Sequence, residues 1–596
     1  MSVVHEYPLS AQQREIVECP PGPQVINAGP GAGKTGTVAE RVRWLLRHHR
    51  PAHGRPPRIL VLSSVGVSVA ALRARLPRTE QIRIGTVHAF CRRLLAEHAG
   101  ALGLPDGLRP IGDRESAILA DEAFGPAYAG SRLTAEQKYG LLLRERERAM
   151  IPELAAPCVW RDTGRFAVEL QRFDALLRAH LRVDFGALLY WTIGGLTDSK
   201  PFLFRAQELH DIIVVDEAQD LSGAQFAVIR LLAERHRHLL LVGDVCQCLY
   251  QFSGARPDLM LGLGTHFPEV RGRILDQNFR SDGVLVDLGN LLSGELPYGQ
   301  RMWTGNGDGA EPVFHSCESA DEEGQRVADY VAGWLRAGVP PAQIGILARR
   351  NREVAALRRV LEGRGIPVEV AAGVREGVAV ATIHGAKGRE WDYVCGVGVE
   401  EGLLPTVALR PGSRDFADPT VREEWHCGYV LVTRARKVFI GTHVPGRRTG
   451  GSGEISRFVA SPSGELKLAR ARWGPQGDRD RAVADVPVRA RRPLSAAALV
   501  AAALDLPRLP PLEGADAPPP SRPLDTLLFP DRAVGGTDTP RGAVPTDPTP
   551  SPGIAHSAGL FAGEIAALFR DSAYPLQPGG PGKKEDGYAH SDAAAD

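Results

Sequence analysis

The stretch Val25-Ile26-Asn27-Ala28-Gly29-Pro30-Gly31-Ala32-Gly33-Lys34-Thr35 decides the fold of the N-terminal part of the chain. An apolar run ends at Ala28, a glycine-rich loop follows, and apolar residues then recur at helical spacing from Val38 to Leu46. This order is typical of a strand, a phosphate-binding loop and a helix. The glycines let backbone N–H groups converge on phosphate oxygens at the helix N-terminus, where the helix dipole also favours anions. GKT after an apolar strand therefore predicts a nucleoside triphosphate site rather than an ordinary glycine turn.

Each residue of this loop has an expected role. Lys34 would reach the β- and γ-phosphates, and the Thr35 hydroxyl would bind Mg²⁺, which prefers oxygen ligands and substrate phosphates. The backbone that would surround the phosphates belongs to Ala28, Gly29, Pro30, Gly31, Ala32 and Gly33.

A second apolar run, Ile212 to Val215, ends in the carboxylates Asp216 and Glu217. Asp216 can hold Mg²⁺, and Glu217 can orient and deprotonate an attacking water. Taken alone, an acidic pair after a strand is often the solvated start of a helix. Together with the phosphate-binding loop, the pair indicates an enzyme that hydrolyses nucleoside triphosphates.

Further apolar runs alternate with helical patterns, which predicts βαβ units and an α/β fold. Helical stretches such as Arg114 to Phe124 and Arg165 to Leu181 dominate residues 96 to 204, and this indicates a helical insertion. A second α/β block of similar size follows over 276–445, so the core looks duplicated. Besides the strand that ends at Ala28, the strands we expect are Arg58 to Ser63, Ile82 to Gly85, Asp211 to Val215, His238 to Gly243, Pro312 to His315, Ile344 to Ala348, Val378 to Ile383, Tyr393 to Val399 and Lys437 to His443.

Composition limits the class of protein. A chain of 596 residues is too long for one core, and a net charge of +1 neither demands nor excludes a nucleic-acid partner. The eight cysteines form no C-x-x-C pair, Cys246 and Cys248 being the closest, so we expect reduced thiols. The first residues do not resemble a signal peptide, and no apolar run reaches the roughly 18 residues of a membrane span. These features favour the cytoplasm and no contact with membranes.

The C-terminal part is rich in Pro, Ala and Gly, which predicts a largely disordered tail over 446–596. Within it Gly559 to Phe569 is a short amphipathic stretch that could dock on a protein partner as a helix. Residual helicity without a partner is the other interpretation.

The chain resembles the UvrD/Rep branch of superfamily 1 helicases, because stretches similar to the motifs of that family follow one another in the same order over the first 445 residues. The resemblance implies two RecA-like parallel-sheet domains, 1A (1–95 and 205–275) and 2A (276–445), with a helical 1B insertion (96–204). It also implies ATP and Mg²⁺ as cofactors, and single-stranded DNA and single/double-strand junctions as partners. A monomer is favoured.

The nucleotide contacts that the resemblance implies come from five motifs. Leu9 to Arg14 resembles the Q motif, so Gln13 would read the adenine edge, although a lone glutamine is usually a surface residue. Leu275 to Ser281 resembles motif IV, in which Phe279 would stack on adenine and Arg280 would contact the γ-phosphate. The remaining implied contacts are Gln247 of motif III as a γ-phosphate sensor, Glu390 of motif V on the nucleotide, and Arg434 of motif VI as a second arginine finger.

The implied DNA contacts come from three motifs. Phe252 would stack on a base, which suits a sequence-tolerant motor because every base has a π-face, although core packing is the commoner role of a phenylalanine. The full set is Thr86 and His88 of motif Ib, Tyr250 and Phe252 of motif III, and Thr382 and His384 of motif V.

Three features depart from the family pattern. Ser64 lies where the family commonly has an aromatic residue, and Ser253 lies where it usually has arginine. Gly365 to Val370 runs almost directly into the strand that begins at Val378, so the family's 2B domain is expected to be absent. All three departures affect DNA binding and unwinding rather than ATP turnover.

The leading hypothesis is an ATP-dependent 3′-to-5′ DNA helicase or translocase in repair or recombination. An alternative is a DNA-stimulated ATP switch that recruits partners through its tail, for example in phage defence, and unwinds little. A catalytically dead scaffold is a third hypothesis, and the intact hydrolysis residues argue against it: Lys34, Asp216, Glu217, Arg280 and Arg434.

Overall fold

A computed structural model of the chain describes the following residues: 9–51, 54–128, 130–150, 166–296, 298–370, 376–406, 416, 418–447, 454–461, 465–468 and 471–473. All of them belong to one compact unit, residues 1–545. The predicted tail beyond residue 473, including the amphipathic stretch 559–569, lies outside the described residues.

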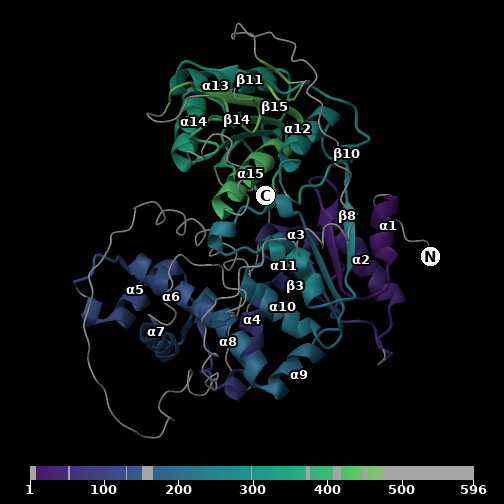
Figure 1. The fold of residues 1–596 in the computed structure, drawn as a ribbon, viewed down its shortest axis with the longest axis vertical. Coiled ribbons are helices and arrows are strands. Elements are labelled where there is room, and N and C mark those ends of the chain that lie inside the picture. Colours follow the sequence, from purple (N-terminus) through teal and green to yellow (C-terminus); the bar gives the residue numbers. More distant parts are fainter. Residues whose placement is uncertain are drawn as a thin grey trace, which may run out of the picture. The chain divides into compact units, whose positions relative to one another are not determined.

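The first sheet contains six parallel strands in the order β3-β2-β6-β7-β1-β8 (Figure 1). Every residue of β1, β2, β6 and β7 is buried. Strands covered on both faces carry apolar residues without alternation, which is why these four read as continuous apolar runs. The strands are β1 (Gln24–Ala28), β2 (Ile59–Ser63), β3 (Ile82–Thr86), β6 (Ile212–Asp216), β7 (Leu239–Gly243) and β8 (Arg271–Leu275).

Helices cover both faces of this sheet. Alternate residues of each strand point to opposite faces, so Val214 packs in one cluster and Ile213 in the other. The predicted residues at the carboxyl ends of β1 and β6 therefore meet at one edge, where open α/β sheets bind ligands. The helices on the Val214 side are α1 (Ala11–Glu18), α2 (Lys34–His48) and α3 (Gly66–Arg75); those on the Ile213 side include α4 (Val87–Glu97) and α10 (Gly223–Ala233).

The segment between β3 and β6 is helical, as predicted. Arg146 is fully buried there between Asp174 and Asp184, so the insertion has a charged centre that is paired internally. Besides α4, this segment contains α5 (Asp113–Phe124), α6 (Ala135–Met150), α7 (Ala167–Ala179), α8 (Phe185–Asp198), α9 (Lys200–Glu208) and the short strands β4 (Arg109–Pro110) and β5 (Arg182–Val183).

The second sheet repeats the topology of the first. Its parallel strands have the order β13-β12-β14-β15-β11-β16. In both sheets, counted along the chain, the order is third, second, fourth, fifth, first and sixth strand, which confirms the duplicated core. The strands are β11 (Val313–Ser316), β12 (Ile344–Ala348), β13 (Ala379–Thr382), β14 (Trp391–Val397), β15 (Ala435–His443) and β16 (Arg472–Trp473).

Helices also cover the second sheet on both faces. Ile346 packs in the cluster that contains α13 and α14, whereas its neighbour Leu347 packs in the cluster that contains α12 and α15. The first sheet with its helices is called the first block below, and the second sheet with its helices the second block. The remaining elements are α11 (Pro257–Leu261), β9 (Gln277–Asn278), α12 (Gly283–Ser293), β10 (Trp303–Thr304), α13 (Ala320–Arg336), α14 (Asn351–Gly363) and α15 (Pro419–Thr433).

The second block continues past its predicted end at residue 445. β16 adds to the edge of the sheet beside β11, and Phe458 is buried with its ring centre 4.8 Å from that of Trp425. The predicted start of the tail at residue 446 is therefore too early. Composition misplaces the boundary because a two-residue strand and a few apolar residues do not stand out against Gly- and Pro-rich neighbours.

We expect Phe458→Ala to destabilise the second block by about 3–5 kcal/mol, the usual cost of removing a large buried aromatic ring. The ring packs so closely on α15 that a Cβ at Gly428 would lie 2.6 Å from it. Urea denaturation followed by tryptophan fluorescence measures the effect. Val370→Ala is the control because Val370 is 93% exposed; equal midpoints for the two variants would contradict this account of residues 454–473.

No helix in the described part of the chain is long and apolar enough to cross a membrane. The cysteines of that part are all free thiols, and six of the seven are buried.

Candidate active site

The phosphate-binding loop connects β1 to α2 as the sequence predicts. Gly31 and Gly33 have φ angles of 71° and 76°, in the left-handed region that favours glycine. A Cβ at Gly31 would also lie 2.6 Å from the Asn278 side-chain oxygen. The Lys34 ammonium donates to the carbonyl oxygens of Ala28 (3.0 Å) and Gly29 (3.2 Å), so it lies directly over the loop.

Thr35 and Asp216 meet at the carboxyl edge of the first sheet. The Thr35 hydroxyl donates to Asp216 Oδ2 at 3.1 Å. Burial and the neighbouring charge of Glu217 raise the pKa of Asp216 to about 7. A hydroxyl and a buried carboxylate beside a phosphate-binding loop fit Mg²⁺, because this cation takes oxygen ligands from one or two side chains and the substrate phosphates.

Glu217 adopts a left-handed backbone conformation, with φ at 55°, which is rare for residues other than glycine and recurs at functional sites. Its Oε2 accepts a hydrogen bond from the Gln219 amide at 2.6 Å. Burial works to raise the pKa of Glu217, but the positive charges of Lys34 and Lys387 hold it below its usual value. The carboxylate is therefore charged and held in one orientation at neutral pH.

Gln247 joins the two blocks at the end of β7. Its amide donates to Asp244 Oδ2 at 2.7 Å, and its Oε1 accepts from the guanidinium of Arg434 at 2.8 Å. Burial lowers the pKa of Arg434 to about 10, and the positive charge of Arg280 contributes to this. Arg434 thus remains a cation at neutral pH, buried beside a residue of the first block.

Phe279 and Arg280 lie next to the phosphate-binding loop. The backbone N–H of Phe279 donates to the carbonyl oxygen of Gly31 at 3.0 Å. Phe279 is 47% exposed as a residue, and the Arg280 guanidinium pairs with the carboxylate of Glu390. Burial lowers the pKa of Arg280.

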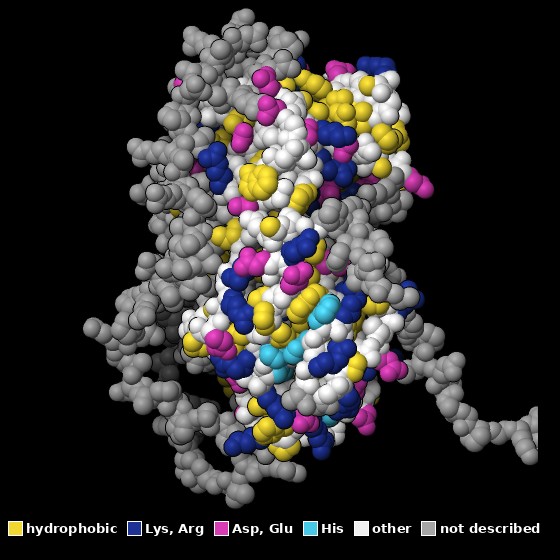
Figure 2. Space-filling view, turned by 90° about the vertical axis from the view of Figure 1, so that its right-hand side faces the viewer, with side chains coloured by type: hydrophobic (Ala, Val, Ile, Leu, Met, Phe, Trp, Pro, Cys, Tyr) yellow, Lys and Arg dark blue, Asp and Glu magenta, His cyan; other side chains and the backbone are white. Residues whose placement is uncertain are grey.

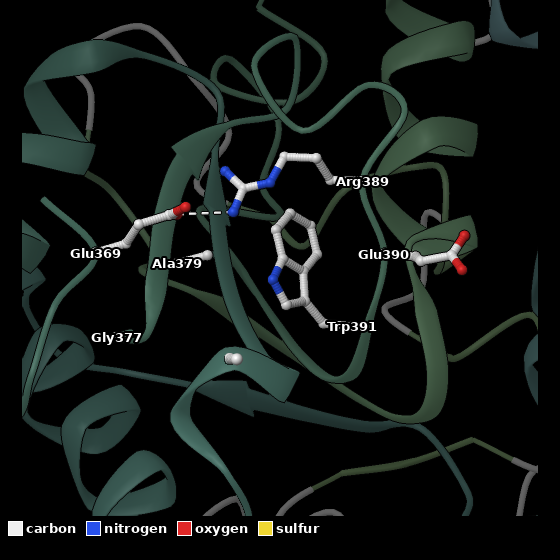
Figure 3. Close-up of a pocket in the computed structure, with 7 residues that line it drawn as sticks. Glu369, Gly377, Ala379, Arg389, Glu390 and Trp391 are labelled. Atoms are coloured by element: carbon white, nitrogen blue, oxygen red, sulfur yellow. Dashed lines mark hydrogen bonds and ion pairs between the residues drawn. The ribbon is translucent and has the colours of Figure 1, made fainter. Parts of the chain in front are cut away.

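Glu390 lines the same pocket as Arg389 and Trp391, and its carboxylate extends away from the Arg389–Glu369 ion pair (Figure 3). In that pocket Arg389 pairs with Glu369 at 2.7 Å and lies over the Trp391 ring, 4.8 Å from its centre. Arg389 is thus paired within the pocket, whereas the Glu390 carboxylate pairs with Arg280.

Gln13 is buried against the same loop. Its amide donates to the carbonyl oxygen of Ala32 at 3.1 Å, and its Oε1 accepts from the backbone N–H of Ser10 in a capping box. Both ends of the side chain are therefore bonded to protein, although the residue lies where the Q-motif interpretation needs it.

The predicted DNA contacts fall into two groups. Tyr250 of the first block and His384 of the second have ring centres 6.3 Å apart, and Thr382 accepts a hydrogen bond from Gly385 in the same turn as His384. Thr86 caps α4, and His88 packs against Phe185 at 5.4 Å. Burial lowers the pKa of His88 to about 4, so it is neutral at physiological pH.

The side chain of Phe252 lies outside the described part of the structure. On the face drawn in Figure 2, Lys and Arg side chains are interspersed with Asp and Glu, in keeping with the net charge of +1.

Two buried residues of the second block also contact the loop after β7, and neither is among the predicted site residues. Lys387 donates to the carbonyl oxygen of Gln247 at 2.7 Å. His426 Nδ1 lies 2.7 Å from the carbonyl oxygen of Cys248, so this nitrogen carries the proton. The motif V stretch contains Lys387, but a lysine in a turn is usually a solvated charge, and His426 gives no sequence signal at all.

Residues 9–268 match the UvrD/REP helicase N-terminal domain, and residues 371–443 match the UvrD-like helicase C-terminal domain. The chain belongs to the UvrD/REP helicase family. The chain is thus a homologue of ATP-dependent DNA helicases.

Individual UvrD/REP relatives match at low identity. A probable DNA helicase of Mycoplasma pneumoniae is 26% identical over 485 residues, which cover 76% of this chain and 86% of that protein. The ATP-dependent DNA helicase PcrA of Staphylococcus epidermidis is 24% identical over 380 residues (61% and 51%), and DNA helicase II of Escherichia coli 28% over 387 residues (62% and 52%). The chain spans about half the length of PcrA and DNA helicase II.

Proposed function

We propose that this chain is an ATP-driven motor that moves 3′ to 5′ along single-stranded DNA and acts in DNA repair or recombination. One observation carries the proposal most: Arg434 of the second block donates to Gln247 of the first, close to the carboxylates that follow β6. A guanidinium in that position can act on a nucleotide held by the other block. The proposed domains are 1A (1–95 and 205–275), 1B (96–204) and 2A (276–445, extended to residue 473 by β16).

The same residues suggest how ATP would be hydrolysed. Lys34 exchanges the carbonyl oxygens of Ala28 and Gly29 for phosphate oxygens, and Thr35 and Asp216 would hold Mg²⁺, which would neutralise phosphate charge. Glu217 orients the attacking water and takes its proton. Phosphoryl transfer gains most from positive charge placed at the γ-phosphate.

The arginines supply that charge by exchanging partners. Arg280 leaves the Glu390 carboxylate and Arg434 leaves the Gln247 amide as both approach the γ-phosphate. Gln247 would sense the γ-phosphate, because its side-chain oxygen contacts Arg434 and its amide nitrogen contacts Asp244. Phe279 and Gln13 would face the adenine.

Movement follows from the alternation of these contacts. ATP draws the two blocks together and hydrolysis releases them, so binding to DNA alternates between the blocks. Tyr250 and His384, one from each block, lie close enough to share a DNA strand. The other proposed DNA contacts are Thr86, His88, Phe252 and Thr382. The direction of movement is inferred from the family.

We also propose that domain 2B is absent. The chain passes from α14, which ends at Gly363, to β13, which begins at Ala379, and Val368 bridges to Val378 in between. In the family, 2B is inserted at this point and contacts duplex DNA, so its loss would favour movement along a single strand over unwinding.

ATP hydrolysis measured side by side with single-stranded DNA, duplex DNA, RNA and no nucleic acid tests the proposed function. We expect the highest rate with single-stranded DNA, because the proposed contacts need unpaired bases and a free backbone. Strand displacement from tailed duplexes of both polarities tests the direction. Equal hydrolysis rates in all four conditions would contradict the proposal of a DNA-dependent motor. Unwinding from a 5′ tail alone would contradict the proposed 3′-to-5′ direction.

The short connection between α14 and β13 also favours a second candidate, a DNA-stimulated ATP switch that recruits a protein partner through its tail. Deleting residues 474–596 distinguishes the two. Unchanged ATPase and translocation with lost function in cells supports recruitment, whereas unchanged cellular function excludes it.

A further inference from the structure

Residues 41–93 contain twelve arginines and one carboxylate, that of Glu80, although the whole chain has a net charge of only +1. The segment runs from α2 through β2, α3 and β3 into α4. Arg43, Arg58 and Arg93 pair with carboxylates that lie outside the segment. This part of the first block therefore has far more positive charge than the net charge of the chain indicates.

One of these arginines lies on the open edge of the first sheet. β3 is the edge strand there, and β2 is its partner in the sheet. The carbonyl oxygen of Gln81 accepts from the N–H of Ile59 on β2. Because carbonyl groups alternate between the two sides of a strand, the carbonyl of Ile84 points to the open edge. The Arg73 guanidinium donates to that carbonyl at 3.2 Å, so it lies along the edge of β3.

Three more arginines follow Arg73 in the chain. Arg75 ends α3 and Arg78 lies in the turn that leads into β3, and both are exposed. Arg83 is a half-buried residue of β3; burial lowers its pKa, and the positive charge of Arg93 contributes to this. An arginine at the C-terminal end of a helix also interacts favourably with the helix dipole, which suits Arg73 and Arg75. Arg78 and Arg83 lie outside α3, so the dipole does not account for them.

These four arginines, called the arginine track below, begin on the strand that ends at a proposed DNA contact. Thr86 is the last residue of β3, and at about 3.3 Å a residue the strand is about 13 Å long. In the register of the sheet Thr86 lies beside Ser63 of β2, and the Ser64 hydroxyl donates to the carbonyl oxygen of Glu217 at 3.2 Å. Serine has no ring on which a base could stack, so phosphate contacts are what these strand ends can offer.

We propose that the arginine track is a binding surface for single-stranded DNA, on which a strand that passes Thr86 continues along the open edge of β3. The inference rests on the proposed function and goes beyond it, because none of the four arginines is among the proposed DNA contacts. Guanidinium groups contact phosphate oxygens whatever the base, which suits a motor that binds any sequence.

The experiment measures the affinity of the full chain for oligo-dT of increasing length, each at several salt concentrations. The track variant replaces the three exposed arginines of the track with glutamine, which removes the charge and keeps a polar side chain. Thermal midpoints check that the fold is retained. The substitutions are Arg73→Gln, Arg75→Gln and Arg78→Gln.

The control variant removes the same charge from exposed arginines of α9, α13 and α14. One of them, Arg359, donates to the carbonyl oxygen of Ala355 in its own helix, as Arg75 does to that of Ala71. A difference between the two variants therefore cannot come from net charge. The control substitutions are Arg205→Gln, Arg336→Gln and Arg359→Gln.

The expected difference depends on the length of the oligo-dT. With long oligo-dT the slope of log K against log salt concentration should be smaller in the track variant by about 2, because each phosphate contact of a single strand contributes about 0.7. With the shortest oligo-dT that binds, which reaches only the contacts at the two blocks, the two variants should have equal affinity.

Two results would overturn the proposal. Equal slopes for both variants at every length would show that the arginines contact no DNA strand. A loss of the same size at every length would show that they act through their general field and not along a path beyond Thr86. If the unchanged chain binds oligo-dT of no length, the proposed function itself fails, which is a distinct outcome.

Discussion

Glu217→Gln should lower kcat for ATP hydrolysis by about 10² to 10⁴, the usual contribution of a general base. Glutamine keeps the size of the side chain and can still meet Gln219, but it cannot accept a proton from the attacking water. The left-handed backbone at Glu217 and the capping of its carboxylate by Gln219 indicate that the group is positioned for this role. ATP binding should be retained, because Lys34 and the loop are unchanged.

Single-turnover hydrolysis and binding of a fluorescent ATP analogue measure the two effects separately. Glu208→Gln is a suitable control, because Glu208 is an exposed glutamate on α9 that pairs with Arg235. Full activity in Glu217→Gln would remove Glu217 from the mechanism, and loss of ATP binding would assign it to the nucleotide pocket instead.

Arg434→Lys should lower kcat further, by about 10³ to 10⁵, which is the usual value of an arginine finger. Lysine keeps the charge but lacks the planar fork that contacts a phosphate through two donors. In the structure Arg434 uses different nitrogens to contact Gln247 and the carbonyl oxygens of Val430 and Arg389. A single ammonium cannot reproduce that set.

Steady-state kinetics with saturating single-stranded DNA measures the loss, and the Michaelis constant for ATP should change far less than kcat. Arg436→Lys is the matched control: Arg436 lies two residues further along and pairs with Asp392 at 2.6 Å. Equal kcat values for the two variants would contradict the assignment of Arg434 as a finger.

The central strands were predictable because burial on both faces gives uninterrupted apolar runs in the sequence. Ile212–Asp216 and Leu239–Gly243 lie within one residue of the expected strands, since every position in them is buried. The edge strand β8 was not expected: Arg271 and Arg273 interrupt its apolar run, and one of its sides has no strand partner. β16 was missed because two residues carry no periodicity.

The site was predictable where the chemistry lies in a contiguous motif. The loop ending in Lys34-Thr35 and the pair Asp216-Glu217 follow strands directly, so sequence order places them at one edge of the sheet. Contacts between the two blocks were harder to predict from the sequence. Lys387 and His426 reach the loop after β7 across long sequence separations, and only the packing of the two blocks shows that they are buried rather than solvated.

The proposed motor requires that a nucleotide bound by the first block is acted on by arginines of the second. A crystal structure of the full chain with a γ-phosphate transition-state analogue, Mg²⁺ and oligo-dT tests this most directly. We predict that the guanidinium groups of Arg280 and Arg434 and the ammonium of Lys34 all lie within hydrogen-bond distance, about 3 Å, of the analogue. Both guanidinium groups remaining on Glu390 and Gln247, with Lys34 alone on the analogue, would contradict it.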